Sequence, residues 1–133
     1  MLNILIVDDS LIIRKNMYKY LLNLGHNVAG EAKTGVQAVA ECKKLKPDLI
    51  TMDITMPDMD GITAVKKIRE FDKNVTIIMV TSHGQEDMVA SALKAGAKGY
   101  ILKPVNEEKV AKSIANIFPQ YKIETDDDEL LDD

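Results

Sequence analysis

The chain has 133 residues, the size of one globular domain, and its 46% hydrophobic and 29% charged residues are typical of a domain with a buried core. No apolar stretch approaches the roughly 20 residues that cross a bilayer. The apolar start of the chain also lacks the flanking pattern of a secretory signal, so we expect a cytoplasmic protein without membrane association. The single cysteine, Cys42, excludes an internal disulfide.

The formal charge of -4 is unevenly distributed along the chain. Residues 124–133 hold seven acids and no base, so residues 1–123 carry 17 bases against 14 acids. We expect one domain at residues 1–123 and a disordered acidic tail at residues 124–133, in which Leu130 and Leu131 leave open a short recognition segment. Because the basic residues are scattered and aromatic residues make up only 5%, nucleic-acid binding is not expected.

The first two predicted units each consist of a strand and a helix. Residues 2–7 form an apolar run that is too short for a helix, and Ser10 then begins a pattern of helical spacing. Residues 27–32 predict a second strand, and Thr34 can cap a second helix. The predicted inner faces of these helices are Ile13, Met17, Tyr20, Leu21 and Leu24 in the first, and Val36, Val39, Cys42 and Leu45 in the second.

Three further units follow the same pattern. Strands are predicted at residues 48–52, 75–80 and 99–102, and helices at residues 62–68, 86–95 and 107–118. Asn106 can cap the last helix. Short strands that alternate with helices imply an α/β fold, a doubly wound parallel sheet with helices on both faces.

Polar residues follow four of the predicted strands. Asp8 and Asp9 come after the first strand, Asp53 after the third, Thr81 after the fourth and Lys103 after the fifth. The carboxyl ends of parallel strands lie at one edge of a sheet, where ligands bind. Clustered carboxylates repel one another unless a cation joins them, and oxygen ligands suit Mg²⁺. A carboxylate could then act as a nucleophile toward phosphorus, with Lys103 and Thr81 stabilising the phosphoryl oxygens.

The sequence resembles the bacterial response-regulator receiver domain, in its stand-alone, CheY-like form. The likeness covers residues 1 to about 120 and rests on five motifs in order: Asp8-Asp9, Met52-Asp53, the stretch MPDMDG at residues 56–61, Thr81-Ser82 and Lys103-Pro104. The resemblance implies a flavodoxin-like sheet of five strands in the order 2-1-3-4-5.

The resemblance also implies roles for the residues at the strand ends. Asp53 would accept the phosphoryl group from a histidine kinase or a phosphotransfer protein. Asp8, Asp9, Asp53 and the backbone carbonyl of Thr55 would bind Mg²⁺ directly or through water. Both phosphorylation and the later loss of the phosphoryl group would then be chemistry of the chain itself, without turnover of a separate substrate.

Three further positions carry implied roles in phosphate binding and switching. Thr81 would hydrogen-bond one phosphoryl oxygen and Lys103 would pair with another, and receiver domains typically have a cis bond between Lys103 and Pro104. Tyr100 matches the aromatic residue that turns inward when Thr81 moves toward the phosphate. Ser82 stands where the family usually has Ala or Gly.

These observations favour a phosphorylation-operated signalling switch, not an enzyme, that acts by contact with another protein. Chemotaxis output to a flagellar motor switch is the first interpretation, and a phosphorelay intermediate is the alternative; we expect a monomer or a weak dimer. A haloacid dehalogenase-type phosphatase would also use an Asp nucleophile, but those enzymes have a DxD pattern after the first strand, whereas Asp8 and Asp9 are adjacent. A pseudo-receiver that never takes phosphate is disfavoured because the polar set is complete.

The other residues with possible chemistry receive structural interpretations. Cys42 is expected to be a buried, inert thiol, and His26 a turn residue. Asp58 and Asp60 are expected to shape the loop before Gly61 and to favour the helix that starts there.

Overall fold

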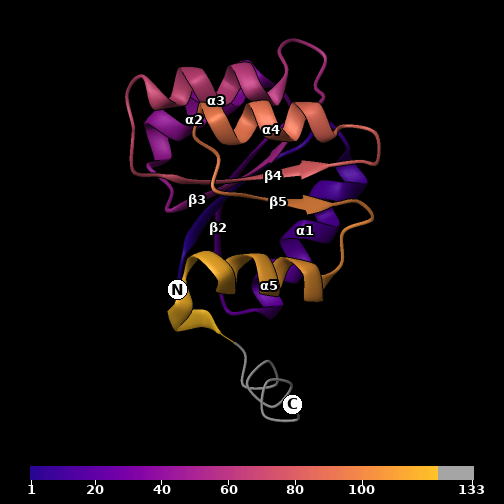
Figure 1. Cartoon of the computed structure of the whole chain (residues 1–133). Helices are drawn as coiled ribbons and strands as arrows, with labels where there is room; N and C mark the ends of the chain where they lie inside the picture. The colour runs from indigo at the N-terminus through magenta and orange to yellow at the C-terminus, as the bar shows by residue number, and fades with distance from the viewer. Residues whose placement is uncertain (123–133) are drawn as a thin grey trace.

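The computed structural model describes residues 1–122 and has three layers, a parallel sheet between two layers of helices (Figure 1). The strands are β1 (Asn3–Val7), β2 (Asn27–Ala32), β3 (Leu49–Asp53), β4 (Thr76–Thr81) and β5 (Gly99–Leu102). The helices are α1 (Leu11–Asn23), α2 (Gly35–Leu45), α3 (Gly61–Arg69), α4 (Glu86–Ala95), α5 (Glu107–Ile117) and the short η1 (Pro119–Tyr121). The predicted acidic tail and the domain boundary at residue 123 lie outside the described residues.

The strand order β2-β1-β3-β4-β5 confirms the predicted doubly wound fold. All neighbouring strands pair in parallel, and α2, α3 and α4 cover one face of the sheet while α1 and α5 cover the other (Figure 1). The order of the strands reverses between β1 and β3, which is where such sheets bind ligands. The predicted strands are displaced by one residue at two places, because Asp53 and Thr81 are themselves the last residues of β3 and β4.

Two apolar cores lie on the two faces of the sheet. Alternate residues of one strand point to opposite faces, so Leu5 packs under α2 and α3 whereas Ile4 packs against α1 and α5. The central strands are buried on both faces, which explains their continuous apolar runs. No helix within residues 1–122 is long and apolar enough to span a bilayer.

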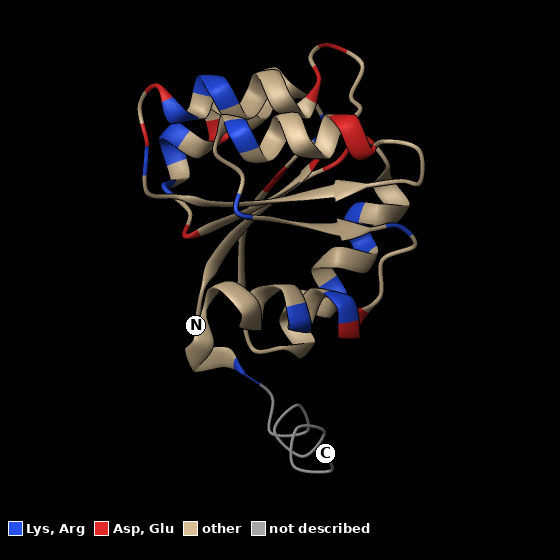
Figure 2. Ribbon diagram, viewed as in Figure 1, with Lys and Arg blue, Asp and Glu red and all other residues tan. Residues whose placement is uncertain are grey.

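Most helices begin at a side-chain cap. The side chains of Ser10, Thr34, Asp60 and Asn106 each accept a hydrogen bond from the backbone N–H three residues later. Helix α4 has no such cap and instead carries acids in its first turn and Lys94 in its last, a distribution visible in Figure 2 that complements the helix dipole. The Lys103-Pro104 bond is cis, as the resemblance implied.

The prediction that Val36 faces the core is wrong. Val36 is 59% exposed, because α2 turns Gly35, Ala38 and Cys42 inward. A Cβ atom at residue 35 would overlap the side chain of Met59, so this close approach favours glycine. Cys42 is buried as predicted, and burial raises the pKa of its thiol to about 11, so the thiol stays protonated.

His26 is more than the turn residue that the sequence predicted. The turn lies at residues 24–25, and the His26 side chain is buried just beyond it. Its Nδ1 accepts a hydrogen bond from the backbone N–H of Leu2 at 3.2 Å, and its ring meets that of Tyr121 edge-on, with ring centroids 4.7 Å apart. The His26 side chain, just before β2, therefore supplies the acceptor for the backbone N–H of Leu2, just before β1.

Candidate functional site

Charged side chains from three strand ends meet at the carboxyl edge of the sheet. Asp8 follows β1, Asp53 ends β3 and Lys103 follows β5, and both acids are almost completely buried. One carboxylate oxygen from each of Asp8, Asp9 and Asp53 lies within 4.8 Å of the others, with Asp9 exposed at the surface. The acids and the lysine that the sequence placed at strand ends are therefore close neighbours in space.

The carboxylate of Asp8 is held by the start of α1. Its Oδ1 accepts from the backbone N–H of Ser10 at 2.9 Å, and its backbone carbonyl accepts from Arg14 Nη1 at 2.8 Å. The other carboxylate oxygen, Oδ2, is buried and has no hydrogen-bond partner among the described residues. An unsatisfied buried oxygen is costly, and it marks a position where a ligand can complete the site.

The three carboxylates fit a divalent cation. Mg²⁺ prefers oxygen ligands and is usually held by one or two protein carboxylates together with water and phosphate oxygens. The unpartnered Oδ2 of Asp8 lies in the same cluster as the oxygens of Asp9 and Asp53. The Thr55 backbone N–H donates to the Asp53 carboxylate, whereas the Thr55 carbonyl as a metal ligand stays a prediction.

Lys103 brings a positive charge to this cluster. Its Nζ lies 3.5 Å from Asp53 Oδ1 and 3.7 Å from Asp8 Oδ2, and its side chain is 24% exposed. The backbone around it is fixed, because its N–H donates to the Thr81 carbonyl at 2.7 Å. Lys109 Nζ donates to the carbonyls on either side of Lys103, those of Leu102 at 3.0 Å and Pro104 at 2.9 Å.

Burial and repulsion by neighbouring acids raise the pKa values of Asp53 and Asp8. The pKa of Asp53 rises from 3.8 to about 6, first because of burial and then because of the charge of Asp8, while Lys103 acts in the opposite direction. Burial also raises the pKa of Asp8. One ammonium group does not offset the negative charge, and a bound divalent cation would favour the ionised form of both acids.

The Thr81 hydroxyl hydrogen-bonds to the start of α4. It is buried at the end of β4 and donates to Gln85 Oε1 at 3.0 Å, with the carbonyl of Ser82 farther away at 3.4 Å. Thr81 therefore borders the site, and its hydroxyl hydrogen is directed to the start of α4.

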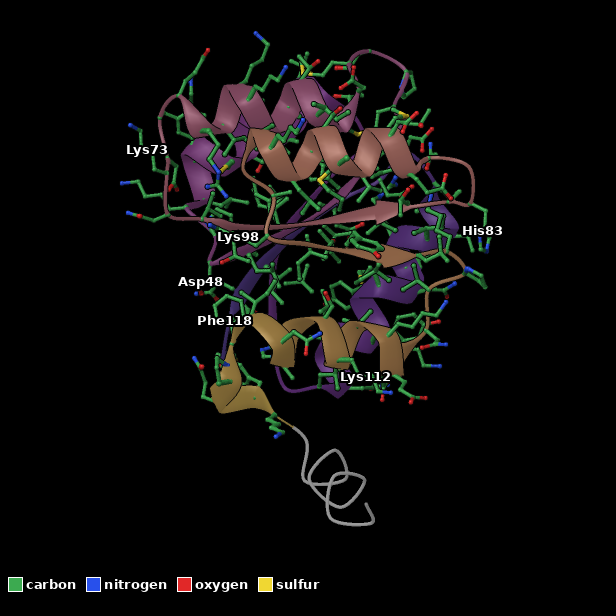
Figure 3. All side chains as sticks on the ribbon, in the orientation of Figure 1. Asp48, Lys73, His83, Lys98, Lys112 and Phe118 are labelled. Carbon is green, nitrogen blue, oxygen red and sulfur yellow. The ribbon has the colours of Figure 1, made fainter. Side chains whose placement is uncertain are left out.

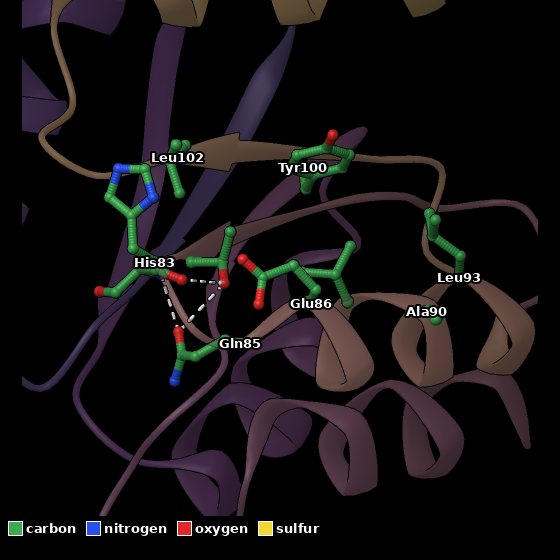
Figure 4. Close-up of a pocket in the computed structure, with 10 residues that line it drawn as sticks. His83, Gln85, Glu86, Ala90, Leu93, Tyr100 and Leu102 are labelled. Atoms are coloured by element: carbon green, nitrogen blue, oxygen red, sulfur yellow. Dashed lines mark hydrogen bonds between the residues drawn. The ribbon is translucent and has the colours of Figure 1, made fainter.

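Tyr100 lies apart from the charged cluster. The residue is 55% exposed and lines a pocket of about 310 Å³ between α4 and β5, which Thr81 also lines (Figure 4). Leu93 and Ala90 of α4 lie along the same pocket. The two residues for which the resemblance implied a switch are thus connected by one open pocket.

Sequence reasoning missed three side chains that organise the site: Arg14, Gln85 and Lys109. Arg14 could have been noticed, because it shares a helix face with Met17 and Leu21, where a charge needs partners. Nothing in the sequence pattern distinguishes Gln85 or Lys109. Asp58 does shape its loop, but its carboxylate accepts from the N–H groups of Gly35 and Val36 and so caps α2 instead of the helix at Gly61.

Comparisons with known proteins agree with this geometry. Residues 4–115 match the family model described as the response regulator receiver domain. The chemotaxis protein CheY of Treponema pallidum is 47% identical over 117 residues, which cover 86% of this chain and 81% of that protein. The chemotaxis protein CheY of Bacillus subtilis is 48% identical over 111 residues, covering 84% of this chain and 92% of that protein.

A solved structure supports the same assignment. A chain of the CheX-CheY-BeF3-Mg²⁺ complex from Borrelia burgdorferi superposes with a TM-score of 0.83 at 41% identity, covering 87% of this chain and 88% of that chain. The family match spans most of the described residues and includes every strand end that forms the acidic cluster. The chain therefore belongs to the response regulator receiver domain family and is a CheY-like response regulator, a class of protein that phosphorylation activates.

Proposed function

We propose that this chain accepts a phosphoryl group on Asp53 in the presence of Mg²⁺ and signals through contact with another protein. The observation that carries the proposal is the buried carboxylate cluster, in which Asp8 Oδ2 lacks a hydrogen-bond partner among the described residues while Lys103 Nζ lies 3.5 Å from Asp53 Oδ1. Asp8, Asp9, Asp53 and the Thr55 carbonyl would hold the metal, which would neutralise charge on the phosphoryl oxygens.

The reaction needs an ionised Asp53 as the nucleophile. A carboxylate oxygen of Asp53 forms a bond to phosphorus, and the bond from phosphorus to the donor nitrogen of a phosphohistidine breaks, with its electron pair staying on the imidazole. Lys103 can follow the transferred group, since its ammonium already faces Asp53. Attack of water on phosphorus then breaks the bond to the Asp53 oxygen, which returns the carboxylate and releases inorganic phosphate.

The output is proposed to be protein contact in chemotaxis. Two CheY proteins at 47% and 48% identity support this choice over a phosphorelay role. The kinase or phosphotransfer donor would approach the exposed edge of the acidic cluster, and a downstream target such as a motor switch protein would contact a surface altered by phosphorylation. We place this activity in the cytoplasm.

The decisive experiment is incubation with acetyl phosphate and Mg²⁺, followed by intact-mass measurement. We expect one added phosphoryl group, which is absent when a chelator removes Mg²⁺ and absent in Asp53→Asn. Asp48→Asn is the matched control, because Asp48 is an exposed acid just before the other end of β3. A phosphoryl group retained in Asp53→Asn would place the acceptor elsewhere and overturn the proposal.

A further inference from the structure

The side-chain amide of Gln85 connects the two loops that border the acidic cluster. Its Oε1 accepts from the Thr81 hydroxyl at 3.0 Å and from the Ser82 N–H at 2.8 Å, as the dashed lines of Figure 4 show. Its Nε2 donates to Thr55 Oγ1 at 2.8 Å, across to the loop that follows β3. The amide therefore has partners on both β4 and the β3–α3 loop.

The position of Gln85 makes these contacts unusual. It is the residue immediately before α4, where a side chain often caps the helix, yet its side chain makes no cap hydrogen bond to α4. The amide reaches back toward the strand ends instead. Since the carbonyl oxygen has two lone pairs, accepting from Thr81 and Ser82 uses its full capacity.

We propose that Gln85 is a positioning residue that holds the Thr81 hydroxyl in the unphosphorylated orientation and competes with the phosphoryl group for it. A hydroxyl has one hydrogen and donates it to one acceptor in a linear bond. Thr81 must release Gln85 before it can donate to a phosphoryl oxygen on Asp53. This inference rests on the proposed function and adds a residue to it.

Competition between Gln85 and the phosphoryl group for the Thr81 hydroxyl predicts how a weaker Thr81–Gln85 bond changes phosphoryl binding. Anything that weakens the Thr81–Gln85 bond lowers the cost of moving Thr81, so it strengthens binding of the phosphoryl group by the same free energy. When Thr81 leaves, the Gln85 oxygen keeps only the Ser82 N–H, and the first turn of α4 loses one of its connections to the sheet. The pocket between α4 and β5, which both Gln85 and Tyr100 line, would respond to this loss.

The test compares binding of beryllofluoride with Mg²⁺, followed by amide resonances in NMR spectra, in the parent protein and in Gln85→Ala. Gln85→Ala removes three hydrogen bonds, of which the bond from Thr81 is the one that the phosphoryl group would replace, so its loss should tighten binding by about threefold to tenfold. Gln85→Glu keeps both acceptor contacts and adds charge, so it should weaken binding. Glu86→Gln is the matched control, because Glu86 contacts the Gly84 N–H in the same pocket, and its affinity should equal that of the parent.

A double-mutant cycle separates positioning of Thr81 from a general effect on α4. In a Thr81→Val background the hydroxyl is absent, so Gln85→Ala should no longer change the affinity for beryllofluoride. Affinity that is unchanged or weaker in Gln85→Ala, or an equal gain in the Thr81→Val background, would overturn the inference. A parent protein that binds no beryllofluoride would instead contradict the proposed function, so the two failures are distinguishable.

Discussion

At the edge of the sheet where the strands begin, polar groups satisfy one another. Asn27 Nδ2 donates to Asn3 Oδ1 at 2.8 Å, and the Asn3 N–H donates to Asp48 Oδ2 at 2.8 Å. The Leu2 N–H donates to His26 Nδ1. Figure 3 shows Asp48 at this end of the sheet and His83 at the opposite end. These bonds tie β1 to the chain segments on both of its sides.

At the opposite edge, buried acids face one another with too little positive charge. Asp8 and Asp53 have raised pKa values, and Asp8 Oδ2 has no hydrogen-bond partner within residues 1–122. At one edge of the sheet the polar groups are hydrogen-bonded to one another and stabilise the fold. At the other edge a buried carboxylate oxygen lacks a hydrogen-bond partner among residues 1–122 and can bind a ligand. The comparison shows that the functional edge is recognised by its unmet interactions, because groups kept only for stability are paired.

The largest expected effect is an increase in stability when the charge of Asp53 is removed. A shift of its pKa from 3.8 to about 6 corresponds to about 2–3 kcal/mol of destabilisation by the ionised group. Asp53→Asn should therefore raise the free energy of unfolding by about that amount at about pH 8 without divalent cations. Urea denaturation measures it, and Asp48→Asn should change the value by less than about 0.5 kcal/mol.

The free energy of unfolding should also depend on pH through Asp53, in a defined direction. Because the folded-state pKa of Asp53 lies above its ordinary value, its stabilising protonated form is fully present below 3.8 and is lost as the pH rises through about 6. Across that window the parent should lose stability relative to Asp53→Asn. If the parent and Asp53→Asn had equal free energies of unfolding at every pH in this window, the charge of Asp53 would not destabilise the fold, and the two edges would not differ in the cost of their polar groups.

A smaller and opposite effect is expected at the other edge from His26→Phe. Phenylalanine keeps a ring against Tyr121 but removes the acceptor of the buried Leu2 N–H, which should lower the free energy of unfolding by about 1–2 kcal/mol. Tyr121→Phe keeps the ring contact and should leave stability almost unchanged. Denaturation at about pH 7.5 compares them.

His26 also gives this edge its own pH dependence. Burial, together with the nearby N-terminal amino group, lowers the pKa of His26 below 6.5. The contribution of neutral His26 is therefore fully present above that pH and is lost as the pH falls through the lowered pKa, the reverse of the Asp53 effect. His26→Phe should remove this loss on acidification, and a variant that keeps it would assign the effect to another group.

The smallest expected effect comes from Asp48→Ala. Its carboxylate accepts from the Asn3 N–H at an exposed position, so water can replace it and the cost should be about 0.5–1 kcal/mol. Asp48→Asn keeps an acceptor oxygen and should recover most of that loss. If Asp48→Ala destabilised the protein more than His26→Phe, the contributions of the hydrogen bonds at this edge would not follow their burial.

The sequence by itself determined the layers and the sheet. Apolar periodicity reports which face of an element is buried, and alternating units restrict the connections between parallel strands. That was enough to predict the five strands and helices, and a motif resemblance added the strand order that the structure confirms. The neighbourhood of Asp8, Asp53 and Lys103 followed as well, since parallel strands end at one edge.

Only the tertiary structure decided which polar group meets which. The bonds from Gln85 to Thr81 and Thr55, and from Lys109 to the carbonyls of Leu102 and Pro104, join side chains to loops whose relative positions no local pattern encodes. The exposure of Val36 has a similar origin, because in the folded chain Gly35 and not Val36 packs closely against Met59. Periodicity specifies a face, whereas a hydrogen bond needs its two atoms within about 3 Å and aligned, and that depends on the whole fold.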